Sequence, residues 1–277
     1  MLDLDKPELQ QALQIIQYTR RSLFLTGKAG TGKSAFLRHI CANTKKKHVI
    51  LAPTGIAAIN AGGSTLHSFF KLPFHPLLPD DERYSIRNLR STLKYTSEKR
   101  KIIREVELIV IDEISMVRAD IIDFIDKVLR VYSRNMREPF GGKQLLLVGD
   151  IYQLEPVIKE DERRMLHPYY PTSFFFGARI WREMRLVSIE LHKVYRQNDP
   201  AFISILDHIR TSDTTDADLR TLNTRVGGTL DTAGGNLAIT LSTRRDTVDY
   251  INEQRLTQLP GAAVPFYGEV KGEFPDN

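Results

Sequence analysis

Short apolar runs alternate along the chain with longer stretches in which apolar residues recur at helical spacing. The runs predict buried strands at 22–26, 49–52, 108–111, 145–148, 186–190 and 238–241. The stretches between them predict helices at 7–20, 33–42 and 117–133, and a further helix that starts at Pro200 with Asp199 as its N-cap. This alternation predicts an α/β fold, with a parallel sheet covered by helices on both faces.

Two segments interrupt the alternation. Residues 61–81 contain adjacent glycines and three prolines, which predict an irregular excursion from the first domain. Residues 227–235 are a glycine-rich turn region. We expect one domain over 1–185 and a second over 186–277, with the boundary near Arg185. The last stretch, 260–277, has no obvious closing element, so the second domain is expected to be cut short.

Composition narrows the class of protein. Apolar residues are 42% of the chain and charged residues 26%, which is typical of a soluble globular protein. No apolar run approaches the roughly 20 residues that span a bilayer, and the N-terminus has no signal-peptide pattern. The single cysteine, Cys41, cannot form an internal disulfide, which favours a reducing compartment, cytoplasm or nucleus.

The positive charge is concentrated in one segment. The whole chain has a net charge of +5, whereas residues 83–104 alone hold eight basic residues and one acid, Glu98. A single helix here would place four cations on one face: Arg83, Arg87, Arg90 and Lys94. Two interpretations stay open, a solvated helix face and a contact with a polyanion.

The string GKAGTGKS, residues 27–34, matches a phosphate-binding loop between a strand and a helix. Its glycines allow backbone N–H groups and a helix N-terminus to face phosphates. Lys33 would contact the terminal phosphates, and the Ser34 hydroxyl would hold Mg²⁺. The predicted ATP-binding residues of the loop are Gly27, Ala29, Gly30, Thr31, Gly32, Lys33 and Ser34.

Acidic and amide side chains follow the next predicted strands. In LIVIDEIS, residues 108–115, Asp112 emerges at the carboxyl end of a buried strand, where it can bind Mg²⁺. Glu113 is then placed to deprotonate a water as general base. Gln153 lies past the strand at 145–148 and either senses the γ-phosphate or is an ordinary turn residue.

Several strings occur together and in order: GKAGTGKS, APTGIAAINAGGSTLHSFF, IDEISMV, PFGGKQLLLVGDIYQLEPV and VYRQ. With these motifs the chain resembles the Pif-one helicases, superfamily-one motors that move 5′ to 3′ on single-stranded DNA. RecD-like helicases share the architecture but match less closely. The resemblance implies a RecA-like P-loop fold with a second RecA-like domain only partly present. The family's last motor motifs would come after residues 241–252, and the sequence reaches residue 277 without any of them.

The resemblance also implies roles for individual residues. Gln10 looks like the family's adenine-reading glutamine, and Arg196 like an arginine finger, with a structural salt bridge as the alternative. A cationic fork independently suits a phosphoryl-transfer transition state. Contacts to the DNA strand are implied for Pro53, Thr54, Thr65, His67 and, near a small wedge or pin, Phe74.

The predicted function is an ATP-dependent DNA helicase that uses ATP and Mg²⁺ and acts in genome maintenance, with roles such as repair, recombination and telomere upkeep. Its expected partners are single-stranded DNA and single-strand/duplex junctions, with no membrane and a monomeric motor. The alternative is a nucleotide-gated module that binds single-stranded DNA without unwinding. An unrelated phosphate-loop ATPase is disfavoured by the APTG and STLHSFF strings.

Overall fold

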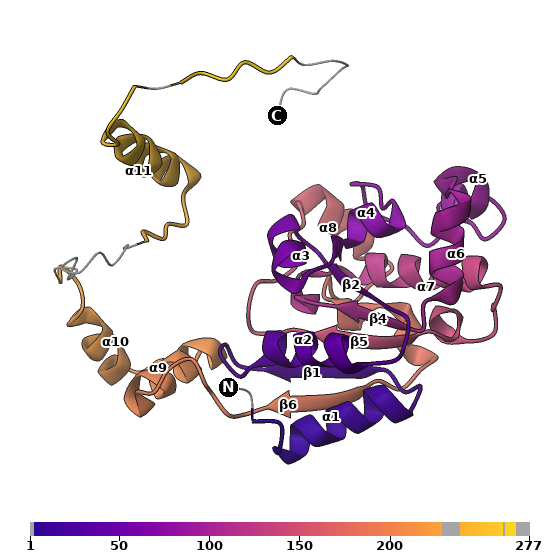
Figure 1. The fold of residues 1–277 in the computed structure, drawn as a ribbon, viewed down its shortest axis with the longest axis horizontal. Helices are drawn as coiled ribbons and strands as arrows, with labels where there is room; N and C mark the ends of the chain where they lie inside the picture. The colour runs from indigo at the N-terminus through magenta and orange to yellow at the C-terminus, as the bar shows by residue number, and fades with distance from the viewer. Residues whose placement is uncertain (1–2, 229–238, 263, 270–277) are drawn as a thin grey trace. The chain divides into compact units, whose positions relative to one another are not determined.

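Six strands form one parallel sheet at the centre of the fold (Figure 1). The computed structural model describes residues 3–228, 239–262 and 264–269. The strand order is β3-β2-β4-β5-β1-β6, and every pairing is parallel. The strands are β1 (Leu23–Gly27), β2 (His48–Ala52), β3 (Ser64–Thr65), β4 (Leu108–Ile111), β5 (Gln144–Val148) and β6 (Val187–Leu191). The predicted parallel α/β sheet is confirmed.

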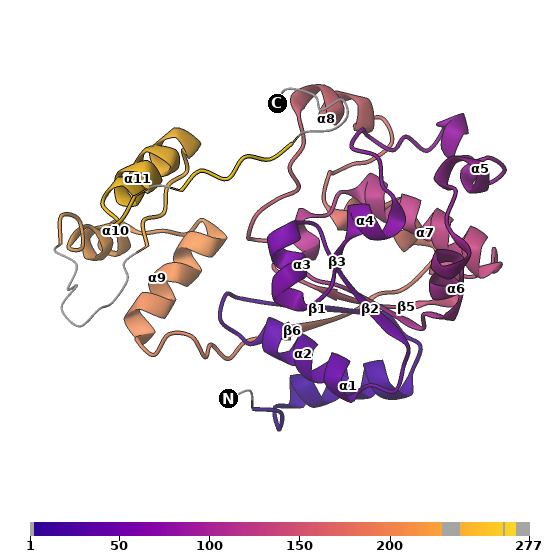
Figure 2. The same ribbon diagram turned by 45° about the horizontal axis from the view of Figure 1, so that its top comes forward.

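Both faces of the sheet are buried at its centre, which explains why β4 and β5 are nearly continuous apolar runs. Along β4, Leu108 and Val110 pack on one face, and Ile109 and Ile111 pack on the other. Helices α1 (Pro7–Tyr18) and α2 (Lys33–Asn43) cover the first face. Helix α7 (Ala119–Ser133) covers the second face together with α4 (Leu66–Phe70) and α6 (Ser97–Glu105), as Figure 2 shows.

The remaining helices are short or peripheral: α3 (Gly55–Ala61), α5 (Leu89–Leu93), α8 (Glu160–Leu166) and α9 (Pro200–Thr211). The predicted cap of α9 is confirmed, because Asp199 Oδ1 accepts the N–H of Ala201 at 2.9 Å and that of Phe202 at 3.2 Å. Among the described residues, no helix is long and apolar enough to cross a membrane.

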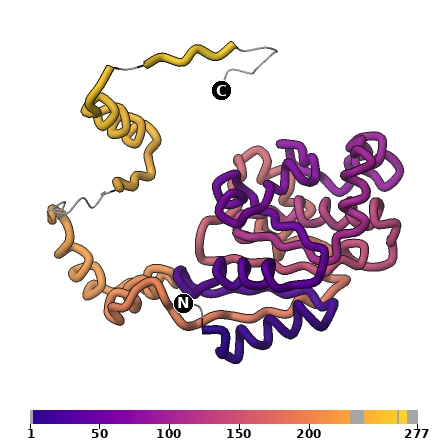
Figure 3. Tube along the Cα trace, viewed as in Figure 1, coloured from indigo at the N-terminus to yellow at the C-terminus, as the bar shows by residue number. Residues whose placement is uncertain are grey.

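Strand β6 lies where the second domain was expected to begin. It pairs with β1 from Leu23↔Val187 to Gly27↔Leu191, and Figure 3 shows the two strands side by side despite their separation along the chain. Ile189 and Leu191 are buried against the α1 and α2 face. The segment after Arg185 therefore completes the first sheet, and the first compact unit extends over Met1–Asp218. The boundary differs from the prediction because the apolar face of β6 is covered by the first core.

The second unit, Leu219–Asn277, contains α11 (Arg245–Thr257) and the end of α10 (Asp216–Asn223). Within the described residues α11 has no buried side chain. The strand expected at 238–241 is not present at 239–241, and residue 238 and most of the glycine-rich region 227–235 lie outside the described residues. The assignment of this unit to a partial second RecA-like domain stays a prediction.

The irregular excursion expected over 61–81 is shorter than predicted. Its first part forms β3 in the main sheet and the buried helix α4, in which Leu66 and Phe70 are core residues. Irregular chain begins only after Phe70, and even there Leu72 and Leu77 are buried. Apolar side chains at helical spacing outweighed the glycine and proline signals here.

The basic segment is not one helix, which corrects the single cationic face predicted for it. A 3₁₀ turn at Glu82–Tyr84, α5 and α6 follow one another, and Lys94 ends α5 in the left-handed region at φ 43°. Leu89 and Leu93 pack inward, whereas Ile86 is exposed.

Gly63 provides a test of the sheet's packing. A Cβ at this position would lie 2.1 Å from the backbone oxygen of Ile50, so Gly63→Ala must push β2 and β3 apart. We expect a loss of about 3 kcal/mol or more in the free energy of unfolding, measured by urea denaturation.

Gly55→Ala is the matched control, because a Cβ there meets no heavy atom within 4 Å among the described residues. It should leave stability unchanged or raise it by up to about 1 kcal/mol. Equal stability of the two variants would contradict the close approach at Gly63.

Candidate functional site

The loop between β1 and α2 depends on glycine. Gly27, Gly30 and Gly32 have φ values of 147°, 79° and 90°, which L side chains rarely adopt. A Cβ on Gly27 would lie 2.6 Å from the Leu191 oxygen, and one on Gly30 would lie 2.6 Å from Arg196 Cβ. The loop therefore has the glycine-dependent backbone shape expected of a phosphate-binding turn, and its close neighbours leave no room for a side chain at Gly27 or Gly30.

Lys33 is held at the start of α2. Its Nζ donates to the carbonyl oxygens of Gly27 at 2.6 Å and Lys28 at 3.0 Å. Burial lowers the pKa of Lys33, and the charges of Asp150, Glu113 and Asp112 raise it in opposition. Three carboxylates therefore lie close enough to act on one ammonium group, although they come from two different strand ends.

Asp112 and Glu113 follow β4 directly, as predicted. Asp112 is buried and accepts the Glu113 N–H at 3.0 Å. Glu113 has a left-handed backbone with φ 51°, a conformation that costs a non-glycine residue about 1 kcal/mol and that clusters at functional sites. Burial raises the pKa of Glu113, and the neighbouring Asp112 charge raises it further. A carboxylate with a raised pKa is a better proton acceptor, which suits the predicted base.

The predicted Mg²⁺ ligands fit that ion. Ser34 is exposed in the first turn of α2, and burial raises the pKa of the Asp112 carboxyl, so a nearby cation would offset its desolvation. No group of three or more metal-ligating side chains occurs in the described part of the chain. Mg²⁺ suits such a site, because it binds through one or two protein oxygens together with phosphate oxygens and water.

Asp150 and Arg210 are site residues that the sequence analysis missed. Asp150 is 1% exposed and accepts from Arg210 Nη2 at 3.0 Å, while the Arg210 guanidinium stacks over Tyr152 at 4.4 Å. The Gln153 side chain donates to Asp150 at 3.2 Å, so its amide is tied to this pair. Asp150 follows an apolar run just as Asp112 does, so the sequence could have indicated it as a site residue. Nothing in the sequence indicates Arg210, because it lies 60 residues from Asp150 along the chain and only the fold brings the two together.

The segment before α9 lies against the phosphate-binding loop. Tyr195 N–H donates to the Gly30 oxygen at 2.8 Å, and an ion pair joins Lys28 to Asp207 of α9. This contact brings Arg196 beside the loop, and its side chain is exposed. Gln10 lies in α1, where its amide donates to the Leu4 oxygen at 2.8 Å. The roles of Arg196 and Gln10 stay predictions.

Pairing of β2 with β3 gathers the predicted DNA contacts. Ala52 pairs with Thr65, and Pro53 and Thr54 follow Ala52 directly. Thr54 Oγ1 accepts the Ala57 N–H at 3.2 Å, and Thr65 Oγ1 accepts the Ser68 N–H at 3.1 Å. Each hydroxyl caps a helix as an acceptor, which leaves its own O–H able to donate to a phosphate oxygen.

His67 and Phe74 lie together beside this pair. Their rings stack with centroids 5.3 Å apart, and Phe74 is 85% exposed. Burial lowers the pKa of His67, and the Arg118 charge lowers it further, which favours a neutral ring. The stacked pair presents an aromatic surface of the kind on which bases stack.

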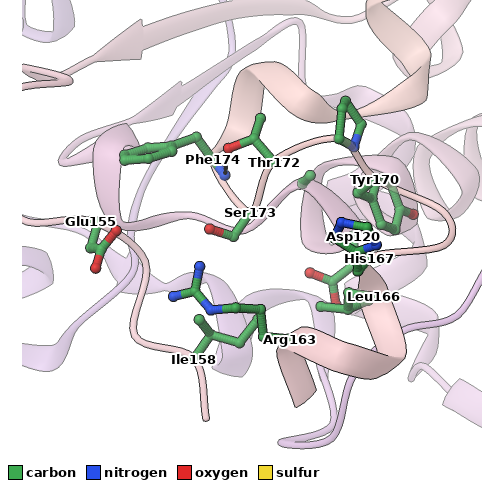
Figure 4. A pocket seen from close by; sticks show the side chains of 12 residues that line it. Asp120, Glu155, Ile158, Arg163, Leu166, His167, Tyr170, Thr172, Ser173 and Phe174 are labelled. Atoms are coloured by element: carbon green, nitrogen blue, oxygen red, sulfur yellow. Dashed lines mark hydrogen bonds between the residues drawn. The ribbon is translucent and has the colours of Figure 1, made fainter. Parts of the chain in front are cut away.

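A hollow of about 200 Å³ beside α8 is separate from the nucleotide site (Figure 4). Arg163 reaches from α8 toward Ser173 across it, with Asp120 in its wall. Asp120 is already bound, because it accepts from Arg118 at 2.8 Å and from the Leu77 N–H at 2.9 Å. We therefore assign Asp120 a structural role.

Comparisons with known proteins agree with the motifs. A family model described as PIF1-like helicase matches residues 6–219. The ATP-dependent DNA helicase PIF1 of Rattus norvegicus is 36% identical over 270 residues, covering 94% of this chain and 39% of the relative. The ATP-dependent DNA helicase RRM3 of Saccharomyces cerevisiae is 33% identical over 267 residues, covering 94% and 34%. The chain belongs to the PIF1-like helicase family.

A solved Pif1 helicase from Bacteroides, in complex with ADP-AlF3 and single-stranded DNA, is also similar. It has a TM-score of 0.84 and 38% identity, covering 95% of this chain and 58% of that one. The RecA-like α/β fold predicted for this PIF1-like chain is thereby confirmed. The chain spans between a third and two fifths of the two curated relatives.

The raised pKa of Glu113 predicts how stability depends on pH. Because folding raises this pKa, the cost of the charged carboxylate is fully present above the folded pKa, and it shrinks as pH falls from that value toward the ordinary pKa of a glutamate. Glu113→Gln should therefore unfold at a higher temperature than the parent at about pH 7.5, with a smaller difference at about pH 5.5.

Glu155→Gln, at an exposed position, is the control and should not change the melting temperature at either pH. A Glu113→Gln variant that melts at or below the parent near neutral pH would show that the carboxylate contributes to folding instead of opposing it.

Proposed function

We infer that this chain forms the nucleotide-hydrolysing part of an ATP-dependent DNA helicase that moves 5′ to 3′ on single-stranded DNA. One observation carries the proposal: the phosphate-binding loop and the predicted DNA contacts lie at the same edge of one sheet. Gly27 ends β1, Asp112 follows β4, and Thr54 follows β2, whose neighbour β3 ends at Thr65. Asp112 of the nucleotide site and Thr54 of the predicted DNA contacts therefore follow directly paired strands, β4 and β2.

Each side chain has a defined part in the proposed hydrolysis. Lys33 neutralises the terminal phosphates, and Asp112 with Ser34 would hold Mg²⁺, which supplies charge neutralisation at the phosphates. Glu113 orients and deprotonates the attacking water. Arg196, whose neighbour Tyr195 is bonded to Gly30, adds a cation where charge develops in the transition state.

The family resemblance supports the direction of movement, the single-strand and junction substrates and genome maintenance. The monomeric motor stays a proposal without that support, because one similar solved structure concerns two coordinating Pif1 helicases at forked duplex DNA. Relatives bear helicase names, and the Bacteroides protein has been solved with single-stranded DNA. The half-buried single cysteine, Cys41, supports a cytoplasmic or nuclear location.

Unwinding assays on duplexes tailed at the 5′ or the 3′ end test the proposal directly. Unwinding confined to the 5′-tailed duplex, with ATP hydrolysis stimulated by single-stranded DNA, would support it. ATP-dependent DNA binding without stimulated hydrolysis would instead favour the nucleotide-gated binding module.

Glu113→Gln should separate binding from hydrolysis. Its amide cannot accept a proton, so we expect the DNA-stimulated turnover to fall about 10²- to 10⁴-fold while ATP and DNA affinities persist. Arg196→Ala should lower turnover about 10³-fold or more. Lys33→Ala should lose both turnover and tight ATP binding. Turnover of Glu113→Gln at the parental rate, in a coupled phosphate-release assay, would exclude Glu113 as the base.

Thr65 allows its capping and DNA roles to be separated. Thr65→Ser keeps the hydroxyl that accepts from Ser68 and can donate to phosphate, so single-strand affinity should stay within about twofold. Thr65→Val loses the hydroxyl and should weaken binding about three- to tenfold, equivalent to one hydrogen bond. Fluorescence anisotropy with a labelled strand measures both, and equal affinities would remove Thr65 from the DNA contacts.

A further inference from the structure

A wide cationic basin lies at the edge of the sheet opposite the nucleotide loop. It is formed by α5, α6 and the end of α7, and has a volume of about 640 Å³. Lys143, just before β5, donates to the Arg104 oxygen at 2.7 Å, and Lys47, just before β2, pairs with Glu105 at 2.8 Å. These contacts tie α6 to the starts of the strands, and Figure 1 shows α5 and α6 on that side.

The basin is strongly positive. Its lining includes six basic side chains, all exposed: Arg90, Lys94, Arg100, Lys101, Arg104 and Arg134. The one acid in the lining, Glu105, is shared between Lys47 at 2.8 Å and Lys101 at 4.0 Å. Among the described residues, the other five cations of the lining form no ion pair with an acid. This density of uncompensated charge attracts a polyanion.

The floor of the basin is rigid and aromatic. Tyr95 and Tyr132 are buried with ring centroids 4.7 Å apart, and the Tyr95 hydroxyl donates to the Phe70 oxygen. The Tyr132 hydroxyl is buried and has no hydrogen-bond partner among the described residues. Arg90 is fixed at the wall by a bond from Nη2 to the Val131 oxygen at 3.0 Å. The cations therefore surround a preformed surface.

We propose that this basin binds the sugar–phosphate backbone of nucleic acid, at a site separate from the strand contacts of Thr54 and Thr65. Long cationic side chains around an open basin suit a row of phosphates without reading bases. Arg100, Lys101 and Arg104 follow one face of α6, so they match an extended backbone better than one compact anion. The site would hold a second segment of the nucleic acid on which the motor works.

The test removes three charges from α6 in the whole chain, with Arg100→Ala, Lys101→Ala and Arg104→Ala combined. Alanine preserves the helix. The control removes three exposed charges elsewhere, with Lys45→Ala, Arg137→Ala and Arg182→Ala combined. Anisotropy titrations without nucleotide, over a series of salt concentrations, measure affinity for a labelled single strand and for a blunt duplex.

For the basin variant, we expect the slope of log affinity against log salt to fall by about two to three units on duplex, at about 0.9 per lost contact, and by less on a single strand. The control variant should change it by less than one unit. A loss confined to duplex assigns the basin to double-stranded DNA, and a loss on both assigns it to backbone generally. DNA-stimulated ATPase at saturating single strand should be unchanged, which keeps this site distinct from the proposed motor function.

An unchanged slope in the basin variant would overturn the proposal, and the cations of the basin would then be ordinary solvated surface charges. Equal losses in the two triple variants would also overturn it, because the effect would then reflect net charge alone. Tighter binding of polyglutamate than of DNA at matched salt, lost in the basin variant, would assign the basin to an acidic protein instead.

Discussion

All six strands run in the same direction, and the rest of the molecule depends on that constraint. In a parallel sheet every carboxyl end meets one edge, so side chains far apart along the chain become neighbours without long loops. At this edge Gly27 ends its strand, and Asp112, Asp150 and Thr54 follow theirs. The cationic segment of α5 and α6 lies at the opposite edge, where the strands begin.

The shared edge concentrates charge away from water. Asp112 and Asp150 are almost fully buried, and among the described residues the Lys33 ammonium donates only to carbonyl oxygens of its own loop. Burial opposes the charge on Lys33, Asp112 and Glu113, and the strained backbone of Glu113 adds a further cost. The apolar cores on both faces of the sheet offset these costs, which is how a destabilised site can persist in a stable domain.

Local patterns predicted much of this arrangement. The phosphate-binding loop, the buried strand before Asp112 and the capped start of α9 follow from short-range residue chemistry, and each was predicted from the sequence. The basic segment was not, because Lys94 adopts a left-handed backbone that breaks the helical pattern. The pairing of Asp150 with Arg210 and the place of β6 depend on contacts between distant parts of the chain, which periodicity does not encode.

The position of β6 also sets the order in which the domain can form during synthesis. β1 emerges from the ribosome early, yet its partner β6 follows about 160 residues later, roughly 10–30 s at ordinary elongation rates. β1 leads into the nucleotide loop. Until β6 is made, one side of β1 is an unpaired edge that can pair with other chains. The nascent protein therefore has its longest exposure to misassembly at the strand on which its chemistry depends, and factors that shield nascent chains would act there.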